Sequence, residues 1–469
     1  MSAELNHYKS NMENTTHGTK TIREPARDIR IIEEADVVVV GGGPAGIAAA
    51  VASARNGVQT ILLERYGHLG GLASGGLVTL IMPMSDGTNT PQIVGICQEV
   101  IDRLDAVGGA LHPRLEDLGS SKSDLVDYWR TYSFCVIDGK IRLSVFMDPE
   151  ILKCILNDMA EEASVKLLLH SLFVNTLVDD DTVKGVVFES KSGRQALLGK
   201  VVIDTTGDGD VYASAGAPFD SRMNPDDRSS RLAFVFRIGN IDPEKYFGFR
   251  KSHPQTHNEL LKELENLRGF TMFIRTSRED VIWVNNNVPH LNGLSVEDLT
   301  QLEVDGRHRM RITHDFLKKQ MPGFENSFII DTASQIGVRC SRRLIGEYVV
   351  TASEICSGVV FPDTIMMGPD FRHDFSPEHP HWHVPYRSLV PRKIKNMLAA
   401  GRCISTDTVT NDLLAPIQYC FATGQAAGTA AAIAVKDSVN MAQVDIKKLQ
   451  KLLSEQKVPL PDEITKNWK

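Results

Sequence analysis

The sequence has few cysteines, and none of them are spaced for a disulfide framework or a metal centre. It contains 7 cysteines in 469 residues, without a C-x-x-C pair and without zinc or iron–sulfur spacing, which indicates reduced thiols in a cytoplasmic protein. The formal net charge of -8 opposes binding to nucleic acid or to an anionic membrane surface. These absences leave a small molecule as the expected partner.

Long apolar runs are also missing. The longest candidate, residues 37–54, is interrupted by Gly41, Gly42, Gly43 and Pro44, so it does not reach the roughly 20 apolar residues of a membrane span. Residues 1–30 are polar and lack the apolar segment of a secretory signal, so we expect a mobile tail there. The chain is therefore expected to be soluble.

What is present is the pattern of a large α/β core. Hydrophobic residues make up 42% of the chain and charged residues 23%, which is within the range of globular proteins. Residues 35–40 are rich in valine, as is typical of a strand buried on both faces, and residues 44–56 form an Ala-rich helical segment that ends at Gly57. Residues 58–64 then read as a second strand, so this region predicts a complete βαβ unit.

A glycine motif joins the first strand to the helix. Gly41, Gly43 and Gly46 have the G-x-G-x-x-G spacing, which permits a tight turn, a close approach to a pyrophosphate, and close packing of helix on strand. Glu64 ends the second strand at the offset expected for an acid that binds a ribose 2′-hydroxyl, and an acid there favours FAD or NAD over NADP. The alternative, a glycine turn in a nucleotide-free protein, agrees less well with this complete pattern.

The remaining pattern predicts two further layers of structure. We expect helices over residues 92–106 and after Asp148, and strands over 165–170, 183–190, 195–203, 232–238 and 280–284, followed by a small-residue helix over 424–436. This order predicts an α/β fold with a discontinuous Rossmann-like domain, residues 31–225 and 386–437. An α+β substrate or cap domain, residues 226–385, is inserted between its segments, and residues 438–469 form a C-terminal helical extension.

Five segments together resemble the FAD-dependent oxidoreductase family, a branch of the glutathione-reductase-like flavoproteins distantly related to the fumarate reductase flavoprotein group. They are ERYGHLGG (64–71), VIDTTGDGD (202–210), GVRCSRR (337–343), PYRSLVP (385–391) and AGRCIS (400–405). One departure is Thr205, which stands where the family's A-T-G-D turn has alanine. The resemblance implies that the Rossmann-like domain binds FAD.

The resemblance and the glycine motif together assign the cofactor-binding residues. The loop after Glu64 is expected to follow the pyrophosphate and ribityl chain, and the helix predicted to begin at Gly424 is expected to direct its N-terminus toward the flavin. The candidates are Gly41, Gly43, Pro44, Ala45, Gly46, Glu64, Arg65, Gly70, Gly71, Leu72, Ser74, Phe173, Val174, Thr206, Gly207, Asp208, Gly401, Arg402, Gln425, Ala426 and Ala427.

The histidine-rich segment 373–387 is the main source of candidate catalytic groups. His383 and Tyr386 are predicted to exchange a proton with the substrate, and Arg387 to orient an anionic group. Arg339 and Arg342 are the second choice, as a carboxylate clamp. For each of these five residues a structural hydrogen bond or ion pair is the alternative.

Two further histidine hypotheses are weaker. His379, His381 and His383 alternate and would share one face of an extended segment, but Pro380 disfavours a central strand there, so no metal site is expected. His68 lies in the predicted pyrophosphate loop as a possible covalent attachment point for flavin, although a simple hydrogen-bonding role is the more common one.

The function predicted from these patterns is that of an FAD-dependent oxidoreductase. No second G-x-G-x-x-G follows a strand and no C-x₄-C pair is present, which excludes a disulfide reductase with its own NAD(P)H domain. We expect hydride transfer between a small organic substrate and flavin N5, with an unidentified electron acceptor or donor. The alternative is a redox or binding subunit of a complex without independent catalysis, and a homo-oligomer is compatible with either.

Overall fold

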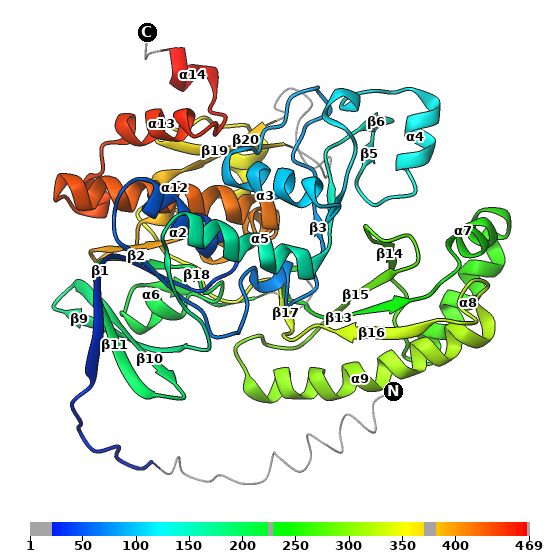
Figure 1. Cartoon of the computed structure of the whole chain (residues 1–469), viewed down its shortest axis with the longest axis horizontal. Coiled ribbons are helices and arrows are strands. Elements are labelled where there is room, and N and C mark those ends of the chain that lie inside the picture. Colours follow the sequence, from blue (N-terminus) through cyan, green and yellow to red (C-terminus); the bar gives the residue numbers. More distant parts are fainter. Residues whose placement is uncertain (1–20, 224–227, 370–380, 467–469) are drawn as a thin grey trace. The chain divides into compact units, whose positions relative to one another are not determined.

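The computed structural model describes residues 21–223, 228–369 and 381–466 (Figure 1). Residues 31–469 form one compact unit, and residues 1–30 are grouped separately. Of the predicted tail, residues 21–29 have no regular secondary structure, Arg30 begins the first strand, and residues 1–20 lie outside the described residues. In the part of the chain that is described, no helix combines the length and apolar character that crossing a membrane requires.

The predicted βαβ unit is present. It consists of β1 (Arg30–Val40), α2 (Pro44–Arg55) and β2 (Thr60–Leu63). β1 and β2 pair in parallel, with Val37 opposite Thr60 and Val40 opposite Leu63. Residues 37–40 are at most 2% exposed, which explains why this strand is continuously apolar rather than alternating.

This unit is the centre of a seven-stranded sheet (Figure 1). The strand order is β8-β2-β1-β11-β10-β9, and β21 pairs in parallel with the end of β11. β9 was not predicted, because Thr176 is its one buried residue and its sequence lacks a regular apolar alternation. The added strands are β8 (Lys166–Leu168), β9 (Leu172–Asp179), β10 (Thr182–Ser190), β11 (Gly193–Asp204) and β21 (Met397–Ala399).

Four helices pack together beside this sheet. They are α2, α3 (Gly95–Ala106), α5 (Pro149–Glu162) and α12 (Ile417–Asp437). The predicted start of α5 is confirmed: the Asp148 carboxylate accepts hydrogen bonds from the backbone N–H groups of Glu150 (3.0 Å) and Ile151 (3.3 Å). A cap of this kind fixes where a helix begins.

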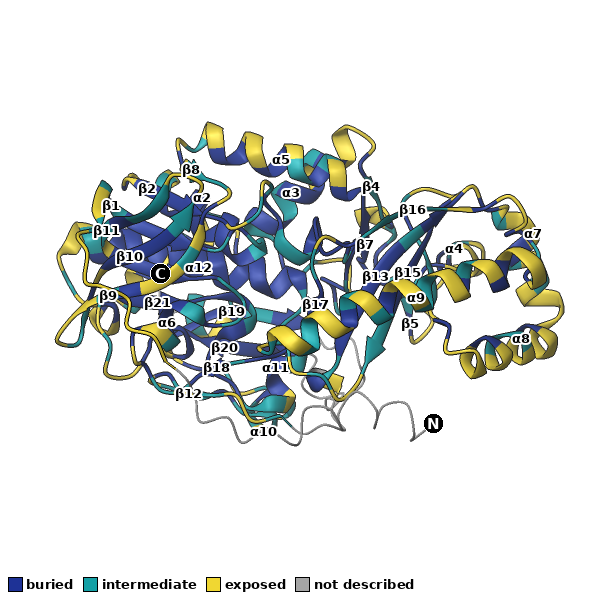
Figure 2. Ribbon diagram, turned by 90° about the horizontal axis from the view of Figure 1, so that it is seen from below, coloured by how far each residue is buried: buried dark blue, intermediate teal, exposed yellow. Residues whose placement is uncertain are grey.

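A second sheet has five strands in the order β14-β15-β13-β16, with β17 beside β13. They are β13 (Leu232–Gly239), β14 (Phe273–Arg275), β15 (Ile282–Val288), β16 (Phe328–Thr332) and β17 (Gly337–Val338). Phe234, Phe236 and Val284 belong to an apolar cluster shared with the helices α7 (Pro243–Ser252), α8 (Pro254–Asn266) and α9 (Val296–Gln320). Ala233 and Trp283 alternate with them and belong to the main core. One face of this sheet therefore packs against the helices and the other against the main core (Figure 2).

Short elements complete the described chain. The paired strands are β3 (Leu80–Ile81), β4 (Ala110–Leu111) and β7 (Val145–Met147); β5 (Val136–Ile137) and β6 (Lys140–Ile141); β12 (Phe219–Asp220) and β18 (Arg343–Leu344); β19 (Thr364–Pro369) and β20 (His381–Pro385). The remaining α-helices are α4 (Ser123–Trp129), α6 (Asp210–Ser214), α10 (Ala352–Cys356), α11 (Thr408–Leu414), α13 (Ile446–Glu455) and α14 (Asp462–Thr465). The mixed α/β fold class is as predicted, whereas the proposed domain boundaries stay predictions.

One predicted boundary is wrong: α12 begins at Ile417, not at Gly424. Gly424 and Gly428 lie inside the helix, where α2 packs against it. A Cβ atom at Gly424 would overlap the carbonyl oxygen of Ala45, and one at Gly428 would overlap that of Ala49. These glycines therefore permit a close helix crossing rather than marking a helix start.

The close crossing predicts a stability difference between two glycine variants. We expect Gly428→Ala to lower the free energy of unfolding by about 1–3 kcal/mol, because the added methyl group must displace α2. The control is Gly248→Ala in α7, where an added Cβ meets no atom within 4 Å and the helix propensity of alanine favours stability. Urea denaturation followed by circular dichroism compares the two variants. Equal stability for both would contradict the close packing of α2 on α12.

Candidate active site

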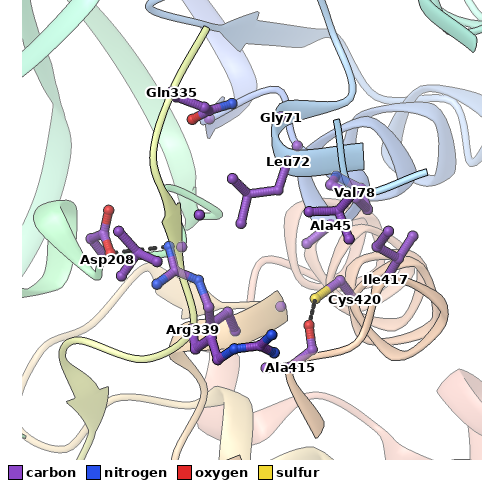
Figure 3. Close-up of a pocket in the computed structure, with 18 of the residues that line it drawn as sticks. Ala45, Gly71, Leu72, Val78, Asp208, Gln335, Arg339, Ala415, Ile417 and Cys420 are labelled. Atoms are coloured by element: carbon purple, nitrogen blue, oxygen red, sulfur yellow. Dashed lines mark hydrogen bonds and ion pairs between the residues drawn. The ribbon is translucent and has the colours of Figure 1, made fainter. Parts of the chain in front are cut away.

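A cavity of about 370 Å³ is lined by both sheets (Figure 3). One part of its wall comes from the turn after β1, the end of β2 and the turn after β11. Another part comes from β13, β14 and β15 of the second sheet, and a third from the first turn of α12. A volume of this size lies within the range of small-molecule pockets.

The turn after β1 has the geometry that the glycine motif predicts. Gly41 has a φ of +103°, and a Cβ there would lie 2.6 Å from the carbonyl oxygen of Thr205. A Cβ at Gly46 would overlap the carbonyl oxygen of Gly41, whereas Gly43 has open space around it. Gly43 is also the N-cap of α2 and supplies no side-chain hydrogen bond to the helix. The N–H groups of the first turn of α2 therefore lie at the cavity wall, in the arrangement that binds phosphates.

Glu64 lies beside this turn at the end of β2. Its carboxylate accepts hydrogen bonds from the backbone N–H of Gly42 (2.5 Å) and of Tyr66 (2.8 Å). The side chain lines the cavity, and the residue is 6% exposed. Two backbone donors hold the carboxylate in place, and its further lone pairs remain available for a ribose hydroxyl.

Asp204, at the end of β11, organises the turn on the other side. Its buried carboxylate accepts hydrogen bonds from the Thr206 hydroxyl (2.8 Å) and from the backbone N–H groups of Thr206, Val211 and Tyr212 (3.0 Å each). Burial raises the pKa of Asp204 to about 6, and these hydrogen bonds oppose the rise. The turn that contains Gly207 and lines the cavity is therefore fixed by one carboxylate.

Arg402 connects this turn to the segment after β21. Its Nη2 atom lies 3.0 Å from the Asp208 carboxylate, and the Asp208 carboxylate also accepts a hydrogen bond from the Ser341 hydroxyl (2.6 Å). The Nη1 atom of Arg402 is buried without a hydrogen-bond partner. Buried polar atoms are normally paired, so this donor in the cavity wall favours a bound ligand with acceptor oxygens.

The first turn of α12 forms the third part of the wall. Pro416, Ile417 and Cys420 all line the cavity. The Cys420 thiol donates to the carbonyl oxygen of Ala415 (3.3 Å), and burial raises its pKa to about 12. The thiol is therefore protonated at neutral pH and is not a nucleophile. The partial positive charge of the helix N-terminus favours negative charge on a ligand here.

The second sheet contributes a wall that sequence reasoning missed. Trp283, Asn285 and Asn287 alternate along β15 and line the cavity. Trp283 is 3% exposed and Asn285 9%, and the Nε1 atom of Trp283 and the Oδ1 atom of Asn285 have no hydrogen-bond partner. The one sequence signal was the polar run at residues 285–287 in an otherwise apolar strand. Its alternate members face the cavity.

Comparison with known proteins identifies the family. The family model described as FAD dependent oxidoreductase matches residues 36–453. The chain belongs to this family. FAD is its cofactor, and the chain is an enzyme of the oxidoreductase class.

Individual relatives are more distant. Thiamine thiazole synthases from Methanococcus vannielii and Methanococcus maripaludis are 30% and 28% identical, over 37% and 38% of this chain. The match spans 56–57% of the length of these curated relatives. Among solved structures, a geranylgeranyl bacteriochlorophyll reductase-like protein from Thermoplasma acidophilum has a TM-score of 0.48 at 14% identity, covering 90% of this chain and 84% of that one. A p-nitrophenol 4-monooxygenase from Pseudomonas putida has 0.44 at 13%, covering 93% and 92%.

The cavity brings together most of the predicted FAD-binding residues of this oxidoreductase. Those that line it are Gly41, Gly43, Pro44, Ala45, Glu64, Arg65, Gly71, Leu72, Phe173, Thr206, Gly207, Asp208, Gly401 and Arg402. The unpaired Arg402 donor, the open space at Gly43 and the uncapped start of α2 fit an FAD pyrophosphate in this cavity. Gly401 has a φ of +83°, and a Cβ atom there would lie 2.8 Å from the Cβ of Ala45 and 3.7 Å from the Sγ of Cys420.

The other predicted FAD-binding residues do not line the cavity. Gly46 packs α2 against the glycine turn. Gly70 and Ser74 belong to the loop around Gly71, where the Ser74 hydroxyl donates to the carbonyl oxygen of Leu69 (2.5 Å). Val174 is 37% exposed on β9. Gln425, Ala426 and Ala427 are buried two turns inside α12, where the Gln425 side chain accepts a hydrogen bond from the backbone of Ile96 (2.9 Å). His68 is also absent from the lining, with Nδ1 3.4 Å from the carbonyl oxygen of Leu69.

Of the predicted catalytic residues, Arg339 lines the cavity and the other four do not. The Tyr386 hydroxyl donates to the carbonyl oxygen of Met441 (2.8 Å), and burial raises its pKa. Arg387 donates through Nε (2.9 Å) and Nη2 (3.1 Å) to the Asp363 carboxylate. Arg342 donates to Asp210 (2.8 Å) and to the backbone of Asp208 (2.9 Å).

His383 is buried in β20, away from the cavity lining, with Nδ1 3.2 Å from the carbonyl oxygen of Val359. The neighbouring residues 370–380, which include His379, lie outside the described residues. Among the described residues, no cluster of three His, Cys, Asp or Glu side chains has the arrangement of a metal site.

Glu64 gives a direct test of the FAD site. We expect Glu64→Ala to weaken FAD binding about 5- to 150-fold, because a hydrogen-bonding group worth about 1–3 kcal/mol is lost. Glu161→Ala, in the exposed part of α5, is the control and should leave FAD affinity unchanged. Titration of the apoprotein with FAD, followed by quenching of flavin fluorescence, measures both. An unchanged affinity in Glu64→Ala would remove Glu64 from the cofactor site.

His383 predicts a pH effect on stability. Burial lowers the pKa of His383 from 6.5 to about 4, so between these two values the unfolded chain binds more protons than the folded one. Its contribution to the free energy of unfolding is complete above pH 6.5 and is lost as the pH falls through about 4. We expect His383→Gln to flatten the fall in stability across this range, and the exposed His308→Gln variant to retain it. The measurement is the free energy of unfolding as a function of pH. Curves that stay parallel for the two variants would contradict the burial of a neutral imidazole at His383.

Proposed function

We propose that this oxidoreductase transfers hydride between a small organic substrate and N5 of FAD. The observation that supports this function is the continuity of the cavity. The same space is lined by the dinucleotide turn at Gly41–Ala45 and by Trp283 and Asn285 of the second sheet. A ligand bound against the second sheet is therefore in the same cavity as the cofactor.

Different parts of the cavity wall bind the cofactor and the substrate. The N-terminus of α2, Glu64, the Thr206–Asp208 turn and Arg402 hold the dinucleotide, and the start of α12 favours negative charge on the ring system. FAD supplies, when bound, a two-electron acceptor or donor at N5. The residues of β15 then bind the substrate from the opposite wall. Apolar neighbours such as Ile274 and Ile417 limit access of water to the reacting groups.

Among the predicted catalytic residues, Arg339 has the position that this function needs. Tyr386 and Arg387 already use their polar groups in hydrogen bonds to Met441 and Asp363. Neither residue lines the cavity, whereas Arg339 does. We therefore assign the substrate side to Arg339 and the β15 face, and treat the segment around His383 as part of the supporting structure.

The alternative function is a redox or binding subunit that needs a partner protein for catalysis. Such a subunit requires FAD but no enclosed substrate wall. The unpaired buried groups of Trp283 and Asn285 favour the enzyme, because unpaired buried polar atoms are costly unless a ligand satisfies them.

Anaerobic mixing of the FAD-loaded protein with panels of alcohols, hydroxy acids and amines tests the proposed function. A substrate bleaches the flavin absorbance near 450 nm. We expect Asn285→Ala to slow this reduction about tenfold with unchanged FAD content, and His383→Asn and Tyr386→Phe to keep the parental rate. Slowing of about 10²–10⁴-fold in either of the last two variants would instead place the general base in the segment around His383 and Tyr386. Bleaching that requires a partner protein would support the subunit alternative.

A further inference from the structure

Two side chains of β15 that line the cavity have a buried polar atom without a hydrogen-bond partner. These atoms are the indole Nε1 of Trp283 and the amide Oδ1 of Asn285. Trp283 is 3% exposed and Asn285 is 9% exposed, so bulk water does not hydrate either atom. Because buried polar atoms are normally paired, the two atoms indicate a ligand in the cavity that supplies both partners.

The neighbouring strands do not supply these partners. Val235 of β13 lies opposite Asn285, and its side chain is apolar. Trp283 lies between Ile274 of β14, which is also apolar, and Arg237 of β13. An arginine side chain carries only donors, as the indole of Trp283 does, so these two side chains cannot pair. The missing donor and the missing acceptor therefore have to come from the cavity.

The two atoms have opposite roles in a hydrogen bond. The indole N–H of Trp283 can only donate, and the Oδ1 atom of Asn285 can only accept. A hydroxyl group accepts through its oxygen and donates through its proton, so it complements both atoms. A ketone, an ether or a carboxylate offers acceptors alone and would leave Oδ1 of Asn285 without a donor.

The spacing along β15 allows one group to reach both side chains. Residues at i and i+2 lie on the same face of a strand, about 7 Å apart. Two hydrogen bonds of about 2.8–3.0 Å that meet at one oxygen join atoms up to about 6 Å apart. A single hydroxyl between Trp283 and Asn285 is therefore compatible with the geometry of the strand.

The wall around this pair of side chains is uncharged. Segment 232–288 contributes to the cavity the uncharged residues Ala233, Met272, Ile274, Trp283, Asn285 and Asn287. Leu80 and Met82 add further apolar lining. An ionised group against these side chains would lose its hydration without a compensating charge from them, whereas apolar carbon atoms are stabilised by burial. The wall therefore favours an uncharged molecule with an apolar body.

We propose that the molecule bound against β15 is a hydrophobic alcohol. Its hydroxyl accepts a hydrogen bond from Trp283 and donates one to Asn285, and its apolar body packs against Met82 and Ile274. Both polar residues bind the alcohol and neither exchanges a proton with it, because an indole and an amide do not titrate near neutral pH. This inference rests on the proposed function, since it names the class of substrate that occupies the same cavity.

A comparison of three ligands tests the hydroxyl separately from the reaction. The probes are cyclohexanol, cyclohexanone and cyclohexyl methyl ether, which share an apolar ring and an acceptor oxygen but of which cyclohexanol alone has a donor. Each is titrated anaerobically into the FAD-loaded protein, and binding is followed by calorimetry and by the flavin absorbance spectrum. We expect cyclohexanol to bind about 5- to 150-fold more tightly than the other two, because these leave the Asn285 acceptor unpaired.

Three variants assign the preference to the proposed residues. Asn285→Leu removes the acceptor at similar volume, so it should lower the affinity for cyclohexanol to that for cyclohexanone. Trp283→Phe removes the donor that all three probes use, so it should weaken them alike, about 2- to 12-fold, and keep the preference. Asn266→Leu, at the exposed end of α8, is the matched control and should retain the parental affinities.

The outcomes separate this inference from the proposed function. Equal binding of cyclohexanol and the ether by the parental protein would overturn the alcohol assignment, whether or not the variants fold and even if another substrate bleaches the flavin. Tighter binding of cyclohexanone, or an unchanged preference in Asn285→Leu, would overturn it as well. Loss of FAD affinity in Asn285→Leu with the preference intact would reassign this residue to the cofactor. Selective alcohol binding without bleaching by any substrate would support the binding site and contradict hydride transfer.

Discussion

The contact between α2 and α12 is the constraint on which the rest of the site depends. Gly424 and Gly428 of α12 lie against the carbonyl oxygens of Ala45 and Ala49, and the Ser53 hydroxyl donates to the carbonyl oxygen of Gly428 (3.1 Å). Such an approach needs small residues on both helices. It joins the first βαβ unit to a helix 375 positions later in the sequence. The start of α12 and the glycine turn line the same cavity.

Buried charge fixes the opposite side of the cavity. Removing the Asp204 carboxylate from water is costly, which is why its pKa is raised to about 6. Three backbone N–H groups and the Thr206 hydroxyl offset part of that cost. Because these donors come from both ends of the turn, its backbone cannot move without leaving a buried carboxylate unpaired. In the same way, the ion pair between Asp208 and Arg402 connects this turn to the segment after β21.

The sequence predicted those parts of the fold that depend on neighbours along the chain. The βαβ unit, the cap at Asp148 and two of the five strands of the second sheet, β13 and β15, follow from local pattern and were confirmed. The start of α12 was not predicted, because glycine inside this helix serves a contact with a distant helix. The pairing of Asn287 with Arg339, 52 positions away, was hidden for the same reason. A polar run in a strand indicates which side chains share one face of the strand. It does not indicate which residues from distant segments contact that face.

The P-Y-R-S segment shows how residue types common in active sites also serve structure. Tyr386 donates to the backbone of Met441, Arg387 forms two hydrogen bonds to Asp363, and the Ser388 hydroxyl donates to the carbonyl oxygen of Pro385 (2.7 Å). Each of these polar groups has a hydrogen-bond partner inside the protein. Together the hydrogen bonds connect β20 to the start of β19 and to the chain after α12. Arg339 differs because it lines the cavity itself. Whether an arginine of such a motif faces the cavity or the protein interior therefore depends on contacts between distant segments, which only the folded chain specifies.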